Sequence, residues 1–302
     1  MTAITFYGRV AVVTGAGGGL GRANALLLAS RGAAVVVNDL GGSVDGSGGD
    51  NAAAAKVVQN IQAEGGRACA NFDDIATPDG AQRLIDAAVQ AYGRVDVLIN
   101  NAGILRDKTL VKQDPADFEA VVRVHLLGSA WCSRAALMVM QRQQYGRIVM
   151  TTSAAGLYGN FGQCNYAAAK LGIVGLMNSL KHEALKFGVL INMVAPVALT
   201  RMTQGLSLER LIGDARPELV SAAVAYLASE ANLESGRIVA AGAGYFSAVR
   251  VVEGVGVHAP SGECTPEFVA AQWGHIHSRE GERPFDSATD ALIGAFTKLA
   301  KT

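Results

Sequence analysis

Short runs of β-branched and apolar residues alternate along the chain with longer segments whose apolar residues recur at helical spacing. Two clear helical segments lie at 20–30 and 81–92. The seven predicted strands are 10–14, 34–38, 67–72, 95–100, 147–151, 189–194 and 237–240. Strands this continuously apolar are usually covered on both faces. The pattern therefore predicts an α/β fold with a doubly wound, seven-stranded parallel sheet flanked by helices.

The strand–helix rhythm fades after about residue 245. Beyond it, TPEFVAAQW (265–273) and SATDALIGAFTKLA (287–300) have the pattern of capped amphipathic helices. We therefore predict one α/β domain over residues 1–245 and a helical C-terminal extension over 246–302 that packs on it.

Composition argues against several classes of function. Lys+Arg and Asp+Glu are equal at 26 each, so no bulk charge favours nucleic acid. No run reaches the roughly 18 apolar residues of a membrane span, and the N-terminal residues lack an export pattern. The cysteines, Cys69, Cys132, Cys164 and Cys264, are scattered without metal-ligand spacing. We expect reduced thiols, no metal site and a cytoplasmic location.

The first predicted strand ends in TGAGGGLGRA, where Gly15, Gly19 and Gly21 are spaced as G-x-x-x-G-x-G. Because these residues lack a Cβ atom, backbone N–H groups and a helix N-terminus can approach a pyrophosphate closely. The cluster follows a strand and opens a helix, which favours nucleotide binding over a plain tight turn. Together with the sheet pattern, it predicts a Rossmann-like domain.

The second predicted strand runs into DLGGSVDGSGGD, and Asp39 ends it about 20 residues past the glycines. A carboxylate at this place can bond the adenosine ribose hydroxyls and would repel a 2′-phosphate. Leu40 and Gly41 supply no positive charge to hold such a phosphate. The sequence therefore favours NAD over NADP. Two alternatives stay open for the glycine-rich loop at 41–49: it folds over the adenosine, or it is a mobile surface loop.

Ser153, Tyr166 and Lys170 form a second constellation. Tyr166 and Lys170, at positions i and i+4, share one face of a helix. Ser153 follows the strand at 147–151, at the sheet edge where open α/β proteins bind ligands. A phenol titrates near 10, and a neighbouring ammonium and a positive nicotinamide ring would both favour its ionised form. The three residues predict hydride transfer between an alcohol and a ketone.

TGAGGGLG, NNAG (100–103) and the Ser153…Tyr166-x-x-x-Lys170 pattern resemble the motifs of the short-chain dehydrogenase/reductase family. The resemblance covers roughly residues 5–245. Longer runs, such as NNAGILRD and YGNFGQCNYAAAKLG, resemble the (3R)-hydroxyacyl-CoA dehydrogenase region of the type 2 multifunctional enzymes of β-oxidation. This implies NAD-dependent oxidation of a (3R)-3-hydroxyacyl-CoA to the 3-oxoacyl-CoA. The alternatives are a 17β-type hydroxysteroid dehydrogenase, a biosynthetic 3-oxoacyl reductase, and a regulator that senses the cofactor.

The resemblance also implies roles for individual residues. Tyr166 would be the general acid/base, Ser153 would bond the reacting oxygen, and Lys170 would bind the nicotinamide ribose and lower the pKa of Tyr166. His125 stands where many family members have an Asn that orders a relay water; it is either catalytic or a satisfied core residue. The other implied cofactor contacts are Gly15, Gly19, Leu20, Gly21, Asp39, Asp74, Ile75, Asn100, Asn101, Ala102, Gly103, Ala198, Leu199, Thr200 and Arg201.

Two long helices are predicted at about 115–142 and 165–187. Small residues gather in the second, and small side chains let helices approach closely: Ala167, Ala168, Ala169, Gly172 and Gly175. These residues could pack on the chain's own sheet. The family resemblance instead favours pairing with symmetry mates, so we expect a homodimer or homotetramer.

Overall fold

The computed structural model describes residues 3–198 and 214–296. The chain forms two compact units, Met1–Ala248 and Val249–Thr302. The first unit contains an α/β sheet with helices on both faces, and the second contains short helices.

The sheet has eight strands in the order β3-β2-β1-β4-β5-β6-β7-β8. The strands β1 to β7 pair in parallel. Their bounds are β1 Val10–Thr14, β2 Ala34–Asn38, β3 Arg67–Asn71, β4 Val97–Asn100, β5 Gly146–Thr151, β6 Val189–Pro196 and β7 Ile238–Gly242. Each of the seven predicted strands is present, and the doubly wound parallel sheet is confirmed. The strand order reverses between β1 and β4, which places the ligand crevice of such a sheet at the carboxyl ends of these strands.

The predicted number of strands was wrong, because an eighth strand, β8 (Tyr245–Val249), follows β7. The connection is the two-residue turn Ala243–Gly244, in which both residues have positive φ, 49° and 77°. Two residues are enough for a hairpin. The prediction relied on alternation of strands with helices, and a hairpin breaks that alternation. Tyr245 and Phe246 are also exposed on this strand, so it lacks the buried pattern of the others.

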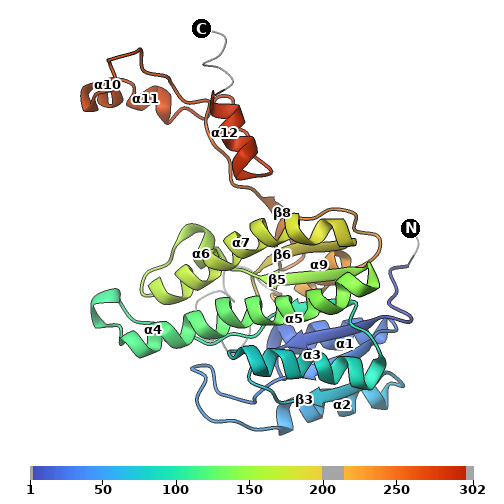
Figure 1. Cartoon of the computed structure of the whole chain (residues 1–302). Helices are drawn as coiled ribbons and strands as arrows, with labels where there is room; N and C mark the ends of the chain where they lie inside the picture. The colour runs from blue at the N-terminus through green and yellow to red at the C-terminus, as the bar shows by residue number, and fades with distance from the viewer. Residues whose placement is uncertain (1–2, 199–213, 297–302) are drawn as a thin grey trace. The chain divides into compact units, whose positions relative to one another are not determined.

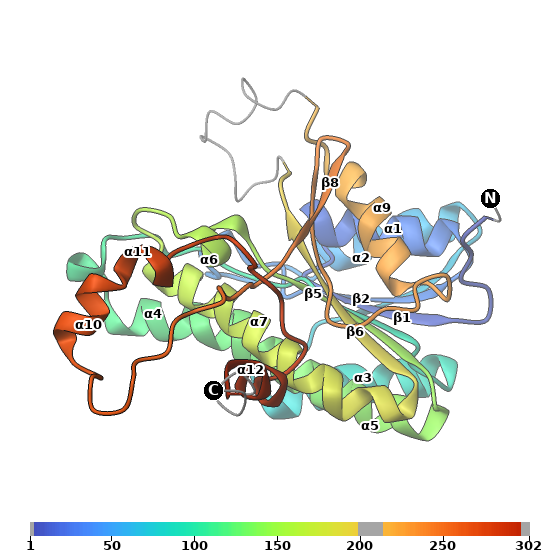
Figure 2. The same cartoon turned by 90° about the horizontal axis from the view of Figure 1, so that it is seen from above.

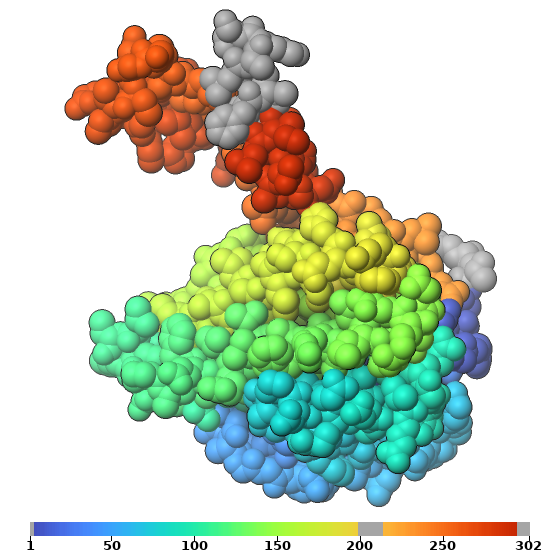
Figure 3. All heavy atoms as spheres, viewed as in Figure 1, coloured from blue at the N-terminus to red at the C-terminus, as the bar shows by residue number. Residues whose placement is uncertain are grey.

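Helices cover both faces of the sheet (Figures 1 and 2). On one face lie α1 (Gly19–Ser30), α2 (Ala52–Ala63) and α9 (Pro217–Ala228). On the other lie α3 (Pro78–Tyr92), α5 (Gly128–Gln143) and α7 (Cys164–Ala184). The helices α3, α5 and α7 run side by side in the space-filling view, coloured from cyan to yellow (Figure 3). Every residue of β1, β2, β4 and β5 is buried between the two layers.

The helix predicted at about 115–142 is a continuous run of three segments: α4 (Pro115–Val122), a π-helical turn η2 (Arg123–Leu127), and α5. Asp114 caps the start of α4, because its carboxylate accepts a hydrogen bond from Ala116 N at 2.8 Å. Before α4 lies the 3₁₀ turn η1 (Leu110–Lys112). A short helix, α6 (Ala154–Tyr158), precedes α7, and the 3₁₀ turn η3 (Leu185–Phe187) follows it.

The second unit contains α10 (Pro266–Ala271), α11 (Trp273–Ile276) and α12 (Ala288–Phe296). Thr265 caps α10 by accepting a hydrogen bond from Phe268 N at 3.2 Å. An antiparallel bridge joins Glu253 to Arg283 within this unit. The packing of this extension on the first unit stays a prediction. In the part of the chain that the structure describes, no helix has the length and hydropathy to cross a membrane.

Candidate active site

The predicted site residues gather where the parallel strands end. Gly15 follows the last residue of β1, Asn100 is the last residue of β4, and Ser153 lies two residues beyond β5. Because the carboxyl ends of parallel strands share one edge of the sheet, residues far apart in sequence meet there.

Ser153, Tyr166 and Lys170 come together at the end of β5. Ser153 is the N-cap of α6, where its Oγ accepts a hydrogen bond from Ala155 N at 3.2 Å. Tyr166 and Lys170 lie one turn apart on α7, and Lys170 Nζ is 5.6 Å from the centroid of the Tyr166 ring. Ser153 also lies close enough to the phenol to lower its pKa. The structure thus brings a phenol, a hydroxyl and an ammonium to one place.

The Lys170 side chain is buried, with 3% of its surface exposed. Its Nζ donates a 2.7 Å hydrogen bond to the carbonyl oxygen of Thr151, the last residue of β5. Burial penalises the charged form, so it lowers the pKa of Lys170 to about 7. Two donor positions of the ammonium remain for other partners.

The pKa of Tyr166 is raised in the protein alone, first because its ring is buried. Ser153 lowers it, and the negative charge of Asp107 raises it further. From the sequence, the positive charges of Lys170 and the nicotinamide ring were expected to lower this pKa. Among the described residues, burial has the largest influence on it, and that influence is upward.

His125 lies on the π-helical turn η2 and is 1% exposed. Its Nε2 lies 3.0 Å from Ile104 N and 2.8 Å from Ile104 O, while no described residue provides a partner for its Nδ1. Burial lowers the pKa of His125 well below its usual value, and the charge of Lys170 acts in the same direction. The imidazole also contacts the Tyr166 ring, so His125 is a buried residue that touches the candidate acid/base, and its part in catalysis stays a prediction.

The glycine cluster between β1 and α1 forms a cradle in which only glycine fits. A Cβ atom added to Gly21 would lie 2.1 Å from the carbonyl oxygen of Gly15. The helix α1 begins at Gly19, and no described side chain caps it, so its first N–H groups can bind a phosphate. Leu20 packs against the core behind them. This cradle fits the pyrophosphate of a dinucleotide.

Asp39 lies beside the cradle, one residue beyond β2. Its Oδ2 accepts a hydrogen bond from Gly17 N at 2.7 Å, and its Oδ1 accepts one from Gly41 N at 2.6 Å. The carboxylate is therefore fixed between the two glycine segments. The sequence analysis missed Gly17, although it stands inside the GAGGG run; an added Cβ there would lie 2.9 Å from the Asp39 carboxylate.

The NNAG segment is held against the same cradle. Asn101 Nδ2 donates to Thr14 O at 3.0 Å and to Gly15 O at 3.1 Å. The Thr14 hydroxyl accepts hydrogen bonds from Asn101 N and Ala102 N. Thr14 is a second residue that the sequence analysis missed, and its signal was its position directly before the first glycine. Asn100 points into the core, where its Nδ2 donates to Ser133 Oγ at 2.9 Å.

Gly103 lies directly against the His125 ring, and a Cβ atom added to it would lie 2.1 Å from the imidazole. Only a glycine therefore fits at this position.

The remaining implied cofactor contacts lie after β3 and β6. After β3, Asp74 Oδ1 accepts a hydrogen bond from Ala76 N at 2.9 Å, and Ile75 is buried. Ala198 is buried just beyond β6. Leu199, Thr200 and Arg201 lie outside the described residues. Within the ranges 3–198 and 214–296, no three His, Cys, Asp or Glu side chains are grouped as a metal site.

The sequence profile of the family described as short chain dehydrogenase matches residues 9–210. Peroxisomal multifunctional enzyme type 2 of Drosophila melanogaster is 46% identical over 276 residues, covering 90% of this chain and 46% of that protein. The full-length structure of that enzyme matches with a TM-score of 0.83 and 36% identity, covering 99% of this chain and 50% of that one. A hydroxyacyl-CoA dehydrogenase of Mycobacterium tuberculosis is 41% identical over 208 residues, covering 65% of this chain and 63% of that protein.

This chain spans about half the length of the Drosophila enzyme. The site geometry, the family profile and the relatives all indicate a short-chain dehydrogenase. The fold and the family imply a nicotinamide cofactor, and the residues of the cradle fit it. The chain therefore belongs to the short-chain dehydrogenase family.

Proposed function

We propose that this chain oxidises the 3-hydroxyl group of a (3R)-3-hydroxyacyl-CoA to a 3-oxo group, with NAD as the cofactor. One observation carries the proposal: the buried Lys170 lies one helical turn from Tyr166, with its Nζ 5.6 Å from the centroid of the Tyr166 ring, at the sheet edge where the dinucleotide cradle also lies. The acyl-CoA is supported by the hydroxyacyl-CoA dehydrogenase among the relatives and by the likeness to multifunctional enzyme type 2.

NAD supplies the hydride acceptor. The hydroxyls of Ser153 and Tyr166 would together hold the alcohol oxygen of the substrate, because the structure brings both side chains to the carboxyl end of β5. Tyr166 in its phenolate form would take the hydroxyl proton as the hydride leaves the carbon atom. Lys170 would hold the nicotinamide ribose with the donor positions that Thr151 does not use.

The high pKa of Tyr166 in the protein alone has a consequence for this chemistry. A base must be deprotonated to act, and burial keeps the phenol protonated at neutral pH. The positive charge of the bound nicotinamide ring would favour the phenolate, and so would Lys170 below about pH 7, where it keeps its proton. We therefore expect the oxidation rate to rise with pH across the neutral range, and the reverse reduction to be favoured at lower pH.

The preference for NAD rests on Asp39. Its carboxylate is fixed by Gly17 N and Gly41 N, so it cannot easily turn away from a 2′-phosphate. A biosynthetic reductase that uses NADPH fits this site less well.

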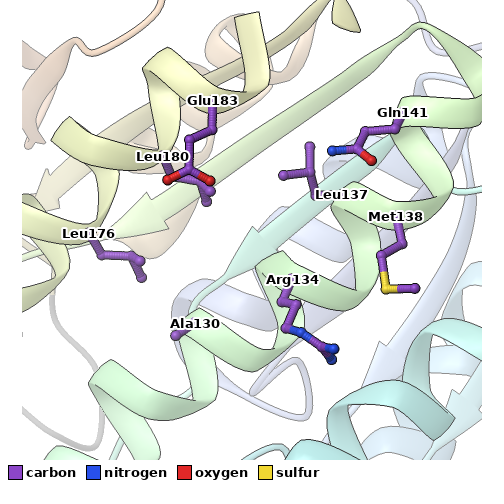
Figure 4. Close-up of a pocket in the computed structure, with 8 residues that line it drawn as sticks. All are labelled: Ala130, Arg134, Leu137, Met138, Gln141, Leu176, Leu180 and Glu183. Atoms are coloured by element: carbon purple, nitrogen blue, oxygen red, sulfur yellow. The ribbon is translucent and has the colours of Figure 1, made fainter.

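We also propose a homo-oligomer built on α5 and α7. A groove of about 320 Å³ lies between these helices, with an apolar floor flanked by Arg134 from α5 and Glu183 from α7 (Figure 4). Of the small residues of α7, Ala169 is buried and Gly172 packs against Leu126, so these two serve the chain's own core. Gly175 has open space beside it. A second copy would cover the groove, as patches meet their own copies in C₂ dimers.

The cytoplasmic location stays a prediction, and the Drosophila relative carries the name of a peroxisomal enzyme. A direct test of the function is NADH formation by the purified protein with three substrates, a (3R)-hydroxyacyl-CoA, its (3S) epimer and a 17β-hydroxysteroid, and with buffer alone as the blank. Turnover that is confined to the (3R) epimer supports the proposal. Turnover of the steroid alone would support the hydroxysteroid alternative, and cofactor binding without any turnover would support the regulator.

A further inference from the structure

The glycine-rich loop at 41–50 is docked on the segment that follows NNAG. Leu105 N donates a 2.8 Å hydrogen bond to Val44 O, and Arg106 Nε donates one of 2.8 Å to Asp45 O. Inside the loop, Ser43 N donates to Ser47 O at 2.9 Å. The loop thus has a defined partner in the chain, Ile104–Arg106, which the sequence did not reveal.

Gly46 makes the closest approach of this loop to Ile104. Its φ is +83°, and an added Cβ would lie 3.0 Å from Ile104 Cγ2. Gly48 has a similar φ of +71°, but an added Cβ would have no neighbour within 4 Å. Both glycines therefore have a positive φ that disfavours other residues, but only at Gly46 would an added Cβ atom also meet a neighbouring side chain.

The segment Ile104–Arg106 also contacts two residues that adjoin Tyr166, namely His125 and Asn165. Ile104 N and Ile104 O both lie within hydrogen-bonding distance of His125 Nε2, which bonds one of them according to its tautomer, and His125 contacts the Tyr166 ring. Arg106 O accepts a 2.9 Å hydrogen bond from Asn165 Nδ2. The Asn165 side chain is fully buried, and its Oδ1 accepts a 2.8 Å hydrogen bond from Tyr166 N.

The Arg106 guanidinium links the loop to a helix. While Nε bonds the loop, Nη1 lies 3.0 Å from Asp117 Oδ1 on α4. The planar fork of a guanidinium holds two such partners in a fixed geometry, whereas an ammonium on a flexible stem holds them less rigidly. Through its side chain and its carbonyl, Arg106 thus joins the loop, α4 and the start of α7.

We propose that Arg106 is a positioning residue that ties the glycine-rich loop to Tyr166, so that cofactor binding and the placement of the acid/base depend on each other. The proposal rests on the proposed function. The loop begins next to Asp39, whose Oδ1 binds Gly41 N, so a ligand at Asp39 acts on the loop directly. Such a coupling is reciprocal: what orders the loop also orders Tyr166, and what loosens one loosens the other.

The first test compares Gly46→Ala with its matched control Gly48→Ala. Both variants place a Cβ atom at positive φ, and only Gly46→Ala presses on Ile104. The readout is hydrogen exchange of the Tyr166 and Ile104 amides, which needs no substrate. We expect exchange at Tyr166 to be at least about fivefold faster in Gly46→Ala, and unchanged in Gly48→Ala, since the added methyl group displaces Ile104 and makes local opening easier. Equal exchange in the two variants would overturn the proposal.

The second test compares Arg106→Gln, Arg106→Lys and Lys108→Gln. Lys108 Nζ also lies near Asp117, at 3.5 Å, so Lys108→Gln weakens this ion pair but leaves the loop in place. We expect Arg106→Gln to speed exchange both in 41–50 and at Tyr166, and to lower kcat about tenfold to 100-fold, as for other displaced reacting groups. Arg106→Lys should recover less than half of the decrease in log kcat that Arg106→Gln causes. Lys108→Gln should have the kcat and the exchange rates of the wild-type protein.

Added NAD separates this proposal from the proposed function. In the wild-type protein, NAD should slow exchange at Tyr166, and in Arg106→Gln it should slow exchange in the loop alone. If NAD protects Tyr166 equally in both proteins, the Arg106 link is refuted while the dehydrogenase function stands. If the wild-type protein does not turn over a hydroxyacyl-CoA but shows the expected exchange, the proposed substrate fails and the link stands.

Discussion

The rings of His125 and Tyr166 meet edge to face, with centroids 5.1 Å apart and planes at 87°. This geometry is a favourable one for two aromatic rings. The contact places a buried imidazole, whose pKa lies well below its usual value, directly against the proposed acid/base. His125 is therefore neutral across the physiological pH range and acts through its contacts rather than its charge.

The neutrality of His125 can be tested by His125→Asn. We expect the dependence of kcat/KM on pH between about pH 6 and 8 to keep its shape, because no protonation of His125 falls in that range. His125→Ala, by contrast, leaves a backbone group of Ile104 unpaired and should lower the stability by about 1–3 kcal/mol. Loss of a limb near pH 6.5 in His125→Asn would show that His125 does titrate during turnover.

Cofactor preference follows from the carboxylate of Asp39. The double variant Asp39→Ala/Leu40→Arg removes the negative charge and adds a positive one beside the adenosine ribose. We expect the ratio of the NAD and NADP dissociation constants to shift toward NADP by about 100-fold, which corresponds to about 2.7 kcal/mol. Calorimetry measures both constants without any substrate. Equal affinities of the unmodified protein for NAD and NADP would contradict the role of Asp39.

The burial of Lys170 makes a prediction for stability. Its pKa is about 7 in the folded chain and about 10.5 when unfolded, so between these values the unfolded chain binds more protons. Stability from this group therefore rises as pH increases from about 7 to 10. Lys170→Met removes the penalty of burying a charge, so its gain in unfolding free energy over wild type should be largest below pH 7. That gain should shrink by a few kcal/mol toward pH 10, at about 1.4 kcal/mol per pKa unit.

The Lys170 comparison is made by denaturant titration without cofactor. Lys56→Met, at an exposed position of α2, is the matched control and should show a nearly constant difference over the same pH range. A pH-independent difference for Lys170→Met would mean that Lys170 keeps an ordinary pKa in the folded chain.

The proposed dimer face is tested by a charge placed in the α5–α7 groove. Met138 lines this groove and is 46% exposed, so Met138→Glu should not disturb the core. We expect it to shift the protein to monomers at micromolar concentration, measured by light scattering, because a second copy would bury the carboxylate. Leu233→Glu, at a position 82% exposed outside α5 and α7, should leave the mass unchanged. A monomeric unmodified protein would refute the dimer.

The fold was largely predictable because its signals are local. The apolar runs gave the parallel strands, and the position of Asp39 after β2 followed from counting along the chain. Ser153, Tyr166 and Lys170 meet for the same reason, since the strand end and the helical spacing are both visible in the sequence. The strand β8 escaped prediction because its exposed Tyr245 and Phe246 do not show the buried pattern.

The features that the sequence could not reveal depend on tertiary contacts. The π-helical turn that presents His125 has no distinct sequence pattern. The docking of the loop 41–50 on Leu105 and Arg106 joins segments about 60 residues apart through two backbone carbonyls. Every residue has a backbone carbonyl oxygen, so the sequence does not show which of them accepts a hydrogen bond. Likewise the raised pKa of Tyr166 comes from burial, which only the packed structure defines.

The most direct test of the proposed chemistry is the single-hydroxyl variant Tyr166→Phe, assayed with NAD and a (3R)-hydroxyacyl-CoA. Removing the hydroxyl leaves the ring and its contact with His125 in place, so NAD should bind with nearly unchanged affinity. We predict that kcat falls by about 10²–10⁴-fold, as expected when a general acid/base is lost. A Tyr166→Phe enzyme that keeps a tenth or more of the wild-type kcat would contradict the account, because the substrate proton would then leave by another route.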